Sequence, residues 1–269
     1  MKDEELDILL LDLAGHYGYD FTDYSRPSLK RRINRLFIYS RIPSFAELRY
    51  KLIHEPEFLK LFIEQITVNV TEMFRDPPFY KALREKVLPE ISSRTHIRIW
   101  HAGCSTGEEV YSLAIILQEM GLYHKSLLYA TDINPSVLEI AMKGIFPLGQ
   151  MRKYSENYLL SGGKKEFSLY YSANYEFAKF DDDLRKRMVF STHNLATDRS
   201  FNEFQLILCR NVLIYFEKGL QAKVLSLFDE SLMPGGFLAL GPRETLRFSS
   251  LFPRYRQIAP SQKIWEKTA

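Results

Sequence analysis

The spacing of hydrophobic residues changes once along the chain, near residue 65. Before that point, apolar side chains recur every three or four positions, which predicts helices that each bury one face. Four such segments lie within 6–13, 29–37, 45–52 and 58–66. We therefore expect an all-helical N-terminal domain over residues 1–68, followed by a second domain over 69–269.

From about residue 95, short apolar runs of strand length alternate with helical stretches. The runs lie at 97–102, 127–133, 187–193, 204–210 and 237–241. This alternation is typical of an α/β fold with a mostly parallel, doubly wound sheet. Met233-Pro234-Gly235-Gly236 predicts the end of a helix over 211–232, and the last residues of the chain predict a closing hairpin.

A segment over about 146–187 interrupts this alternation. Gly162-Gly163 is a candidate turn within it. Apolar and polar positions alternate around Phe167, Leu169, Tyr171, Tyr175 and Phe177. The pattern predicts a small inserted β-subdomain of antiparallel strands. Such an insert either presents an edge that can bind a peptide strand from a partner or merely covers the main sheet.

A turn rich in small residues follows the first predicted strand of the sheet. Gly103 and Gly107 allow the backbone to approach a ligand closely, and Glu108 and Glu109 open the next helix. Two carboxylates at a helix start disfavour a pyrophosphate cofactor such as NAD and favour a cation. S-adenosylmethionine provides a sulfonium and an ammonium without any phosphate. Asp132, at the end of the next predicted strand, stands where an acidic residue binds ribose hydroxyls.

Composition and charge exclude only a few classes of protein. The net charge of +3 over 269 residues does not indicate a nucleic-acid-binding protein. The two cysteines, Cys104 and Cys209, cannot form a disulfide framework, and no Cys/His cluster has the spacing of a metal site. The acidic start followed by a short apolar run is typical neither of a signal peptide nor of a membrane span. We expect a cytoplasmic, monomeric protein that binds no metal and does not insert into membranes.

Five motifs in fixed order carry a family resemblance. They are Asn69-Val70-Thr71-Glu72-Met73-Phe74-Arg75-Asp76, the Gly103–Ser112 segment, Ala130-Thr131-Asp132-Ile133, His193-Asn194-Leu195 and Cys209-Arg210-Asn211-Val212-Leu213-Ile214-Tyr215-Phe216. Together they resemble the CheR family of chemotaxis methyltransferases over the whole chain. The resemblance implies an N-terminal helical domain, a class I (Rossmann-like) S-adenosylmethionine-dependent methyltransferase domain and an inserted β-subdomain. It also implies that the substrate is a glutamate side chain in the cytoplasmic helices of a chemoreceptor, which becomes a methyl ester.

The resemblance also assigns residues to the site. The implied catalytic pair is Arg75, which orients the substrate carboxylate, and Tyr215, which completes the alignment. The residues implied to bind the cofactor are Asn69, Thr71, Arg75, Gly103, Glu109, Asp132, Asn194, Leu195, Arg210 and Asn211. Because His101 stands where many class I enzymes carry an acid, the methionine ammonium is left to Glu108 or Glu109.

The expected chemistry needs no general base, because a glutamate with a pKa of about 4.3 is already ionised at neutral pH. Simpler interpretations of the same residues stay open. Arg75 could form a surface ion pair with Asp76, Asn69 or Thr71 could cap the following helix over 79–87, and Tyr215 could be ordinary packing.

A basic stretch over 26–36 is the candidate receptor-binding surface. On a helix, Leu29, Ile33 and Leu36 would face the core. The candidate receptor-binding residues Lys30, Arg31 and Arg35 would face solvent, either to contact acidic receptor helices or simply as a solvated face.

Two other functions compete with receptor methylation. Asp76-Pro77-Pro78-Phe79 matches the loop of nucleic-acid amino methyltransferases. Its place before a helix argues against that role, because proline is favoured at helix starts. The second alternative is a non-catalytic module that binds S-adenosylmethionine or its product as a signal.

Overall fold

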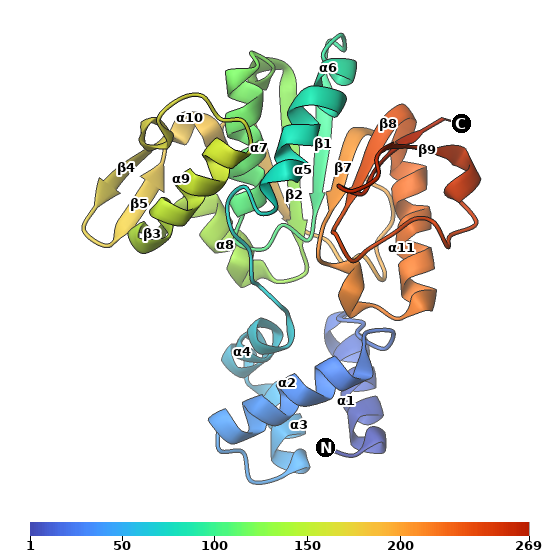
Figure 1. Ribbon diagram of the computed structural model, residues 1–269. Helices are drawn as coiled ribbons and strands as arrows, with labels where there is room; N and C mark the ends of the chain where they lie inside the picture. Colours follow the sequence, from blue (N-terminus) through green and yellow to red (C-terminus); the bar gives the residue numbers. More distant parts are fainter. Residues whose placement is uncertain (269) are drawn as a thin grey trace.

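The computed structural model describes residues 1–268 and shows a small helical domain below a larger α/β domain (Figure 1). The helical domain contains α1 (Asp3–Tyr17), α2 (Arg26–Tyr39), α3 (Phe45–His54) and α4 (Pro56–Ile66). Their apolar faces meet in one core, in which Leu9, Ile33 and Phe62 are fully buried. The four helices lie where the hydrophobic periodicity predicts them.

An extended segment leads from α4 to a broken helix. That helix consists of α5 (Pro77–Ala82), a π-helical turn over Leu83–Val87 and α6 (Leu88–Ile91). Pro77 stands at the first position of α5, where its missing N–H leaves no hydrogen bond unmade. The predicted helix over 79–87 is therefore present, although one turn of it is wider than an α-helix.

The larger domain is built on a seven-stranded sheet with the order β6-β2-β1-β7-β8-β10-β9. Its strands are β1 (Ile97–Ala102), β2 (Ser126–Asp132), β6 (Met188–Thr192), β7 (Phe204–Cys209), β8 (Leu232–Leu240), β9 (Tyr255–Ala259) and β10 (Ile264–Lys267). The first five strands in the spatial order are parallel, and β10 runs antiparallel to both of its neighbours. Both the parallel sheet and the closing hairpin confirm the expectation. The strand order reverses between β1 and β7, and in such sheets ligands bind at the carboxyl ends of the strands beside that point.

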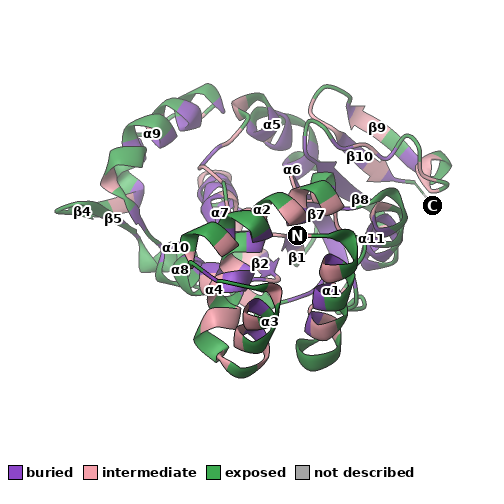
Figure 2. Ribbon diagram, turned by 90° about the horizontal axis from the view of Figure 1, so that it is seen from below, coloured by how far each residue is buried: buried purple, intermediate pink, exposed green. Residues whose placement is uncertain are grey.

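Helices cover both faces of this sheet (Figure 1). The helices α7 (Glu108–Glu119) and α5 pack on one face, and α11 (Lys218–Ser231) packs on the other. Neighbouring residues of a strand point to opposite faces, so Ile99 joins the core beside α7 and Trp100 joins the core beside α11. The helix α8 (Pro135–Lys143) lies along β2 and β6. Seen from below, α2 of the helical domain crosses in front of the sheet near β1 and β7 (Figure 2).

The insert forms a three-stranded antiparallel sheet with the order β3-β5-β4. Its elements are β3 (Ile145–Pro147), α9 (Met151–Leu160), β4 (Tyr171–Asn174), β5 (Phe177–Phe180) and the short α10 (Asp182–Arg185). The predicted strand positions are partly wrong. A 3₁₀ turn spans Phe167–Tyr170 and buries its first and last side chains, three residues apart, while Leu169 is exposed. Tyr175 lies in the hairpin turn, and Gly162-Gly163 follows α9 instead of joining two strands.

The predicted helix over 211–232 is also corrected. Residues 211–217 form a loop with a 3₁₀ turn over Leu213–Tyr215, and α11 begins only at Lys218. Asn211 has φ +62°, a left-handed backbone conformation that cannot continue a helix. Strand β8 then begins at Leu232 and includes the Pro-Gly-Gly sequence. Within residues 1–268, no helix is both long enough and apolar enough to cross a membrane.

Candidate functional site

A cavity of about 360 Å³ lies between the helical domain and the carboxyl ends of β1, β2 and β7. One wall comes from α2 and the loop before it, including Tyr24, Ser28 and Arg32. A second wall comes from the extended segment after α4, and a third from the strand ends at Asp132 and Arg210. A cavity of this size, built where the strand order reverses, suits a nucleoside-sized ligand.

The two domains are joined beside this cavity by backbone hydrogen bonds. Ser25 N donates to Tyr215 O over 2.8 Å, and Glu217 N donates to Asp23 O over 2.8 Å. Between these bonds, Tyr24 and Phe216 form an isolated antiparallel bridge, with ring centroids 4.7 Å apart. The cavity walls from the two domains are therefore fixed to each other, and neither domain builds the cavity alone.

The glycine turn after β1 packs closely against neighbouring loops. Gly103 has φ +79°, and a β-carbon there would lie 2.5 Å from Cγ2 of Val212. The N–H groups of Gly103 and Cys104 both donate to Thr131 O, at 2.8 and 2.9 Å. These bonds tie the end of β1 to the end of β2. The sequence argument for small residues here therefore has a physical basis in both backbone conformation and space.

Asp132 is fixed at the end of β2 by two backbone hydrogen bonds. Its Oδ2 accepts from Ser105 N over 2.8 Å, and its Oδ1 accepts from Asn134 N over 3.0 Å. Burial raises the pKa of this carboxyl group above its ordinary value. Each carboxylate oxygen has a further lone pair, so the side chain can still accept hydrogen bonds from ribose hydroxyls in the cavity that it lines.

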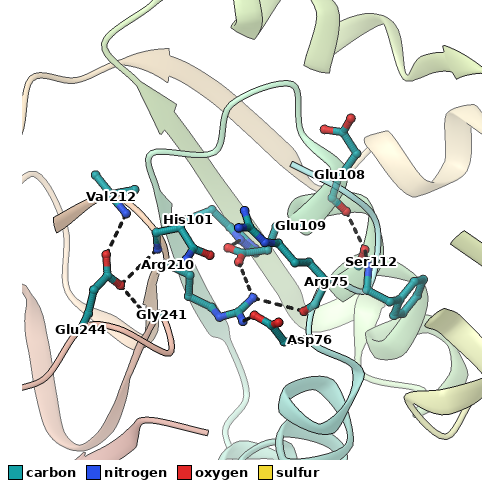
Figure 3. Close-up of polar contacts among 12 residues, drawn as sticks. Arg75, Asp76, His101, Glu108, Glu109, Ser112, Arg210, Val212, Gly241 and Glu244 are labelled. Atoms are coloured by element: carbon teal, nitrogen blue, oxygen red, sulfur yellow. Dashed lines mark hydrogen bonds and ion pairs between the residues drawn. The ribbon is translucent and has the colours of Figure 1, made fainter. Parts of the chain in front are cut away.

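Of the two acids at the start of α7, only Glu109 lines the cavity. Its Oε1 lies 3.0 Å from Nδ1 of the fully buried His101, and its Oε2 lies 3.5 Å from a guanidinium nitrogen of Arg210. Burial alone would raise the pKa of Glu109, but the hydrogen bond with His101 and the charge of Arg210 lower it. The side chain of Glu108 points away from Glu109 and Arg210 (Figure 3). It accepts a hydrogen bond from Thr106. The geometry thus favours Glu109 as the carboxylate for an ammonium group.

Arg210 connects this carboxylate to the segment before α5. Its side chain is only 3% exposed, and Nη2 lies 2.7 Å from Oδ2 of Asp76. Its guanidinium carbon stands 3.9 Å from the ring centroid of Phe79. Asp76 is therefore paired with Arg210, and the alternative surface pair of Asp76 with Arg75 is wrong. Arg75 donates to Val70 O over 3.1 Å and lines the cavity.

Most of the sequence-predicted site residues come together in the cavity wall. They are Asn69, Thr71, Arg75, Gly103, Glu109, Asp132, Leu195, Arg210, Asn211 and Tyr215. Asn194 is not in that wall, because its side-chain oxygen accepts from Ala196 N over 3.0 Å and shapes the turn that presents Leu195. Neither Asn69 nor Thr71 caps α5, which has no side-chain cap. The individual roles of these residues stay predictions.

Sequence reasoning missed two notable residues of the wall. Arg32 lies beneath the exposed face of α2, donates to Ile66 O and stands 5.2 Å from the ring centroid of Tyr215. Arg32 lies three residues after the buried Leu29, and residues three apart on a helix are neighbours, so this spacing was a signal for the inner face of α2. Tyr80 is fully buried, and its hydroxyl has no hydrogen-bond partner among the described residues. No sequence signal marks Tyr80, because the cavity around it is assembled from distant segments.

The predicted receptor-binding residues of α2 lie outside the cavity. Lys30 forms an ion pair with Asp3 of α1 at 2.7 Å. Arg31 and Arg35 are exposed, and neither forms an ion pair with any residue in 1–268. A role for these two arginines in recognition therefore stays a prediction, while Lys30 has a partner within the protein.

Neither the cysteines nor the possible metal ligands suggest a second reactive site in the described residues. Cys104 and Cys209 are buried free thiols, and burial raises the pKa of each. Across the part of the chain that the structure describes, no three His, Cys, Asp or Glu side chains are grouped as metal ligands. The charged groups of the wall suit S-adenosylmethionine: Glu109 can bind the ammonium, and Asp132 can bind the ribose.

Comparison with known proteins agrees with this site. Residues 4–67 match the family described as the all-alpha domain of CheR methyltransferases, and residues 69–258 match its SAM binding domain. A Pseudomonas putida protein, provisionally named methyltransferase Cher3, is 44% identical over 266 residues, covering 99% of this chain and 97% of the relative.

Two further relatives are named as chemotaxis proteins. The chemotaxis protein methyltransferase of Listeria innocua is 34% identical over 232 residues, covering 85% of each chain. Chemotaxis protein methyltransferase 2 of Pseudomonas aeruginosa is 34% identical over 232 residues, covering 84% of this chain and 79% of the relative. The chain therefore belongs to the CheR methyltransferase family, and its larger domain is a class I, Rossmann-like domain that binds S-adenosylmethionine.

Proposed function

We propose that this protein acts in chemotaxis by transferring the methyl group of S-adenosylmethionine to glutamate side chains in the cytoplasmic helices of chemoreceptors. The observation that carries the proposal is the placement of two guanidinium groups, those of Arg32 and Arg75, in the same cavity wall as Glu109 and Asp132. The acidic pair suits a cationic methyl donor, and the arginines suit an anionic acceptor.

The acceptor side of the cavity is suited to alignment. When bound, S-adenosylmethionine supplies a methyl group on a sulfonium, which a carboxylate can accept by in-line displacement without any proton transfer. Arg75 orients that carboxylate through its planar pair of N–H groups, and Tyr215 completes the alignment beside it. Arg75 acts by positioning, because a stronger grip on the carboxylate would weaken the nucleophile.

Exclusion of water from the cavity contributes to the rate. Joining a sulfonium to a carboxylate removes charge, so water stabilises the separated ions more than the transition state. Leu29, Phe216 and Tyr24 line the cavity from the helical domain and the loop joined to it. A receptor helix lying against α2 would cover the remaining opening.

Receptor recognition is assigned to two surfaces. The first is the exposed face of α2 at Arg31 and Arg35, which attracts acidic residues that flank the methylated glutamate. The second is β4, one of the two edge strands of the insert, which pairs with β5 on one side and so offers the backbone groups of its other side to a peptide strand. A receptor C-terminal peptide would occupy that edge and tether the enzyme.

The test uses purified protein, methyl-labelled S-adenosylmethionine and the soluble cytoplasmic fragment of a chemoreceptor from the same organism. We expect alkali-labile label on the fragment and none on a matched fragment whose methylatable glutamates are changed to glutamine. A receptor that lacks its C-terminal tail tests the role of β4. Label on oligonucleotides instead would support nucleic-acid methylation. Cofactor binding without label on any receptor would support the non-catalytic module and overturn the proposal.

A further inference from the structure

Glu244 is a buried carboxylate behind the cavity, in the turn that follows β8. It is 5% exposed and does not line the cavity. Its Oε1 accepts from Val212 N over 2.8 Å, and its Oε2 accepts from Asn211 N over 3.1 Å and from Gly241 N (Figure 3). Within residues 1–268 it forms no ion pair, so its hydrogen-bond partners are backbone N–H groups.

The loop after β7 has a backbone shape that favours a negatively charged acceptor at this place. Asn211 has φ +62°, and the successive N–H groups of Asn211 and Val212 both point toward Glu244. Successive amides in such a conformation form a concavity that binds negative groups. Without Glu244, two inward-pointing N–H groups would lose their acceptor, which is costly for buried backbone.

This loop supplies one side of the cofactor cavity. Arg210, Asn211, Val212, Ile214 and Tyr215 all line that cavity. Arg210 contacts Asp76 and Glu109, and the side chain of Val212 packs against the turn at Gly103. A shift of the backbone at residues 211 and 212 would therefore move Arg210 and the groups that it and Val212 contact in the cavity wall.

We propose that Glu244 is a positioning residue, whose carboxylate fixes the backbone of Asn211 and Val212 so that Arg210 and Asn211 are held in place to bind the cofactor. The residue acts through the loop and touches neither cofactor nor substrate. Gly241 allows this arrangement, because a β-carbon there would lie 2.6 Å from Oε2 of Glu244 and 2.7 Å from Asn211 N.

The test compares Glu244→Gln with Asp229→Asn in the full-length protein. Glutamine keeps the shape of the side chain but places an NH₂ group where a carboxylate oxygen accepts hydrogen bonds, so at least one backbone N–H faces another donor. Asp229 is a control for the loss of a buried carboxylate elsewhere, because it is also 5% exposed and does not line the cavity, although it pairs with Arg254 and Lys267 as well as Tyr255.

Two measurements report on each variant. Amide hydrogen exchange over residues 209–216 reports the loop, and calorimetry with S-adenosylhomocysteine reports the cofactor site. For Glu244→Gln we expect faster exchange in that peptide and about tenfold weaker binding, as for the loss of one buried charged hydrogen bond. Asp229→Asn should lower the melting temperature without either change. Glu244→Asp, which keeps the charge on a shorter side chain, should fall between wild type and Glu244→Gln.

Unchanged exchange and affinity in Glu244→Gln would overturn the proposal, as would equal changes in Asp229→Asn. If Glu244→Gln fails to fold, Glu244→Asp decides by the same two measurements. Because no receptor is used, the result is independent of whether receptor glutamates are the substrate.

Discussion

The two sides of the cavity are built in different ways. On the sheet side, the buried His101 and Arg210 both contact Glu109, and Arg210 also pairs with the exposed Asp76. On the helical-domain side, α2 is held near the sheet by a few backbone bonds, and its outer arginines face solvent. The sheet side thus presents mutually bonded charges that suit a small ligand, while the outer face of α2 presents charges that are unpaired within residues 1–268 and suit a larger partner.

The largest effect should follow from Glu109→Gln. This change removes the charge that would bind the cofactor ammonium and leaves Arg210 buried with one partner fewer. We expect S-adenosylhomocysteine to bind about 100-fold more weakly, which corresponds to roughly 3 kcal/mol. Methylthioadenosine, which has the nucleoside but no amino-acid end, should bind as it does to wild type. Calorimetry with both ligands checks this, and equal losses for the two would show that Glu109 does not bind the ammonium.

A somewhat smaller effect is expected on the acceptor side, from Arg75→Lys. Lysine keeps the positive charge but cannot form the planar pair of hydrogen bonds with a carboxylate. Misalignment should lower kcat for receptor methylation by about tenfold to a hundredfold. The affinity for S-adenosylhomocysteine should change much less, and steady-state kinetics with a receptor fragment separates the two. If kcat stays at the wild-type value, orientation by Arg75 is excluded.

The exposed face of α2 should have a weaker influence that is limited to the receptor. Reversing Arg31 and Arg35 to glutamate should raise the KM for receptor about fivefold, because rim charges mainly steer association. Cofactor affinity should be unchanged. Lys30→Glu is the control, since it breaks the solvent-screened pair with Asp3 and should change stability little. An unaltered KM in the double variant would remove these arginines from the interface.

The smallest effect concerns the pH at which each acid stops binding the cofactor. The pKa of Asp132 is raised above its ordinary 3.8 by burial, so its ionised form is lost at a higher pH than in solution. Burial raises the pKa of Glu109, but the hydrogen bonds and charges of His101 and Arg210 together outweigh burial and lower this pKa below its ordinary 4.5, so its charge persists. As the pH falls, the affinity for methylthioadenosine should weaken first, and the affinity ratio of S-adenosylhomocysteine to methylthioadenosine should change only at lower pH. Titration calorimetry on folded protein measures both. If the ratio of the two affinities falls at a higher pH than the methylthioadenosine affinity does, Glu109 is protonated before Asp132 and the prediction is wrong.

Local sequence patterns predicted the elements whose shape is set locally. The helices of the first domain and the strands of the sheet follow from periodicity, and Gly103 and Asp132 follow from the geometry of strand ends. Roles for Arg75 and Tyr215 came only from the family resemblance. The 3₁₀ turn at Phe167 was missed because its aromatic side chains are buried by contacts from other segments.

The other features that the sequence did not predict arise from contacts between residues far apart in the chain. The loop over 211–217 depends on Glu244, which lies 33 residues after Asn211. The pairing of Asp76 with Arg210 joins residues 134 positions apart, and the nearer Arg75 was the misleading candidate. Arg32 enters the site because the helical domain meets the sheet there, and Tyr80 enters it because α5 packs beside the strand ends. Periodicity cannot report such contacts.

The backbone hydrogen bonds that join the two domains have a thermodynamic consequence. Tyr215 is bonded through its backbone to Ser25, immediately before α2. A force that displaces α2 must therefore reshape the pocket, and a nucleoside that fills the pocket must in turn resist that displacement. If a receptor docks on α2 as proposed, its docking and cofactor occupancy alter each other's affinity by the same factor, because linked equilibria are reciprocal. The order in which the two ligands arrive then changes the path of assembly and leaves the free energy of the ternary complex unchanged.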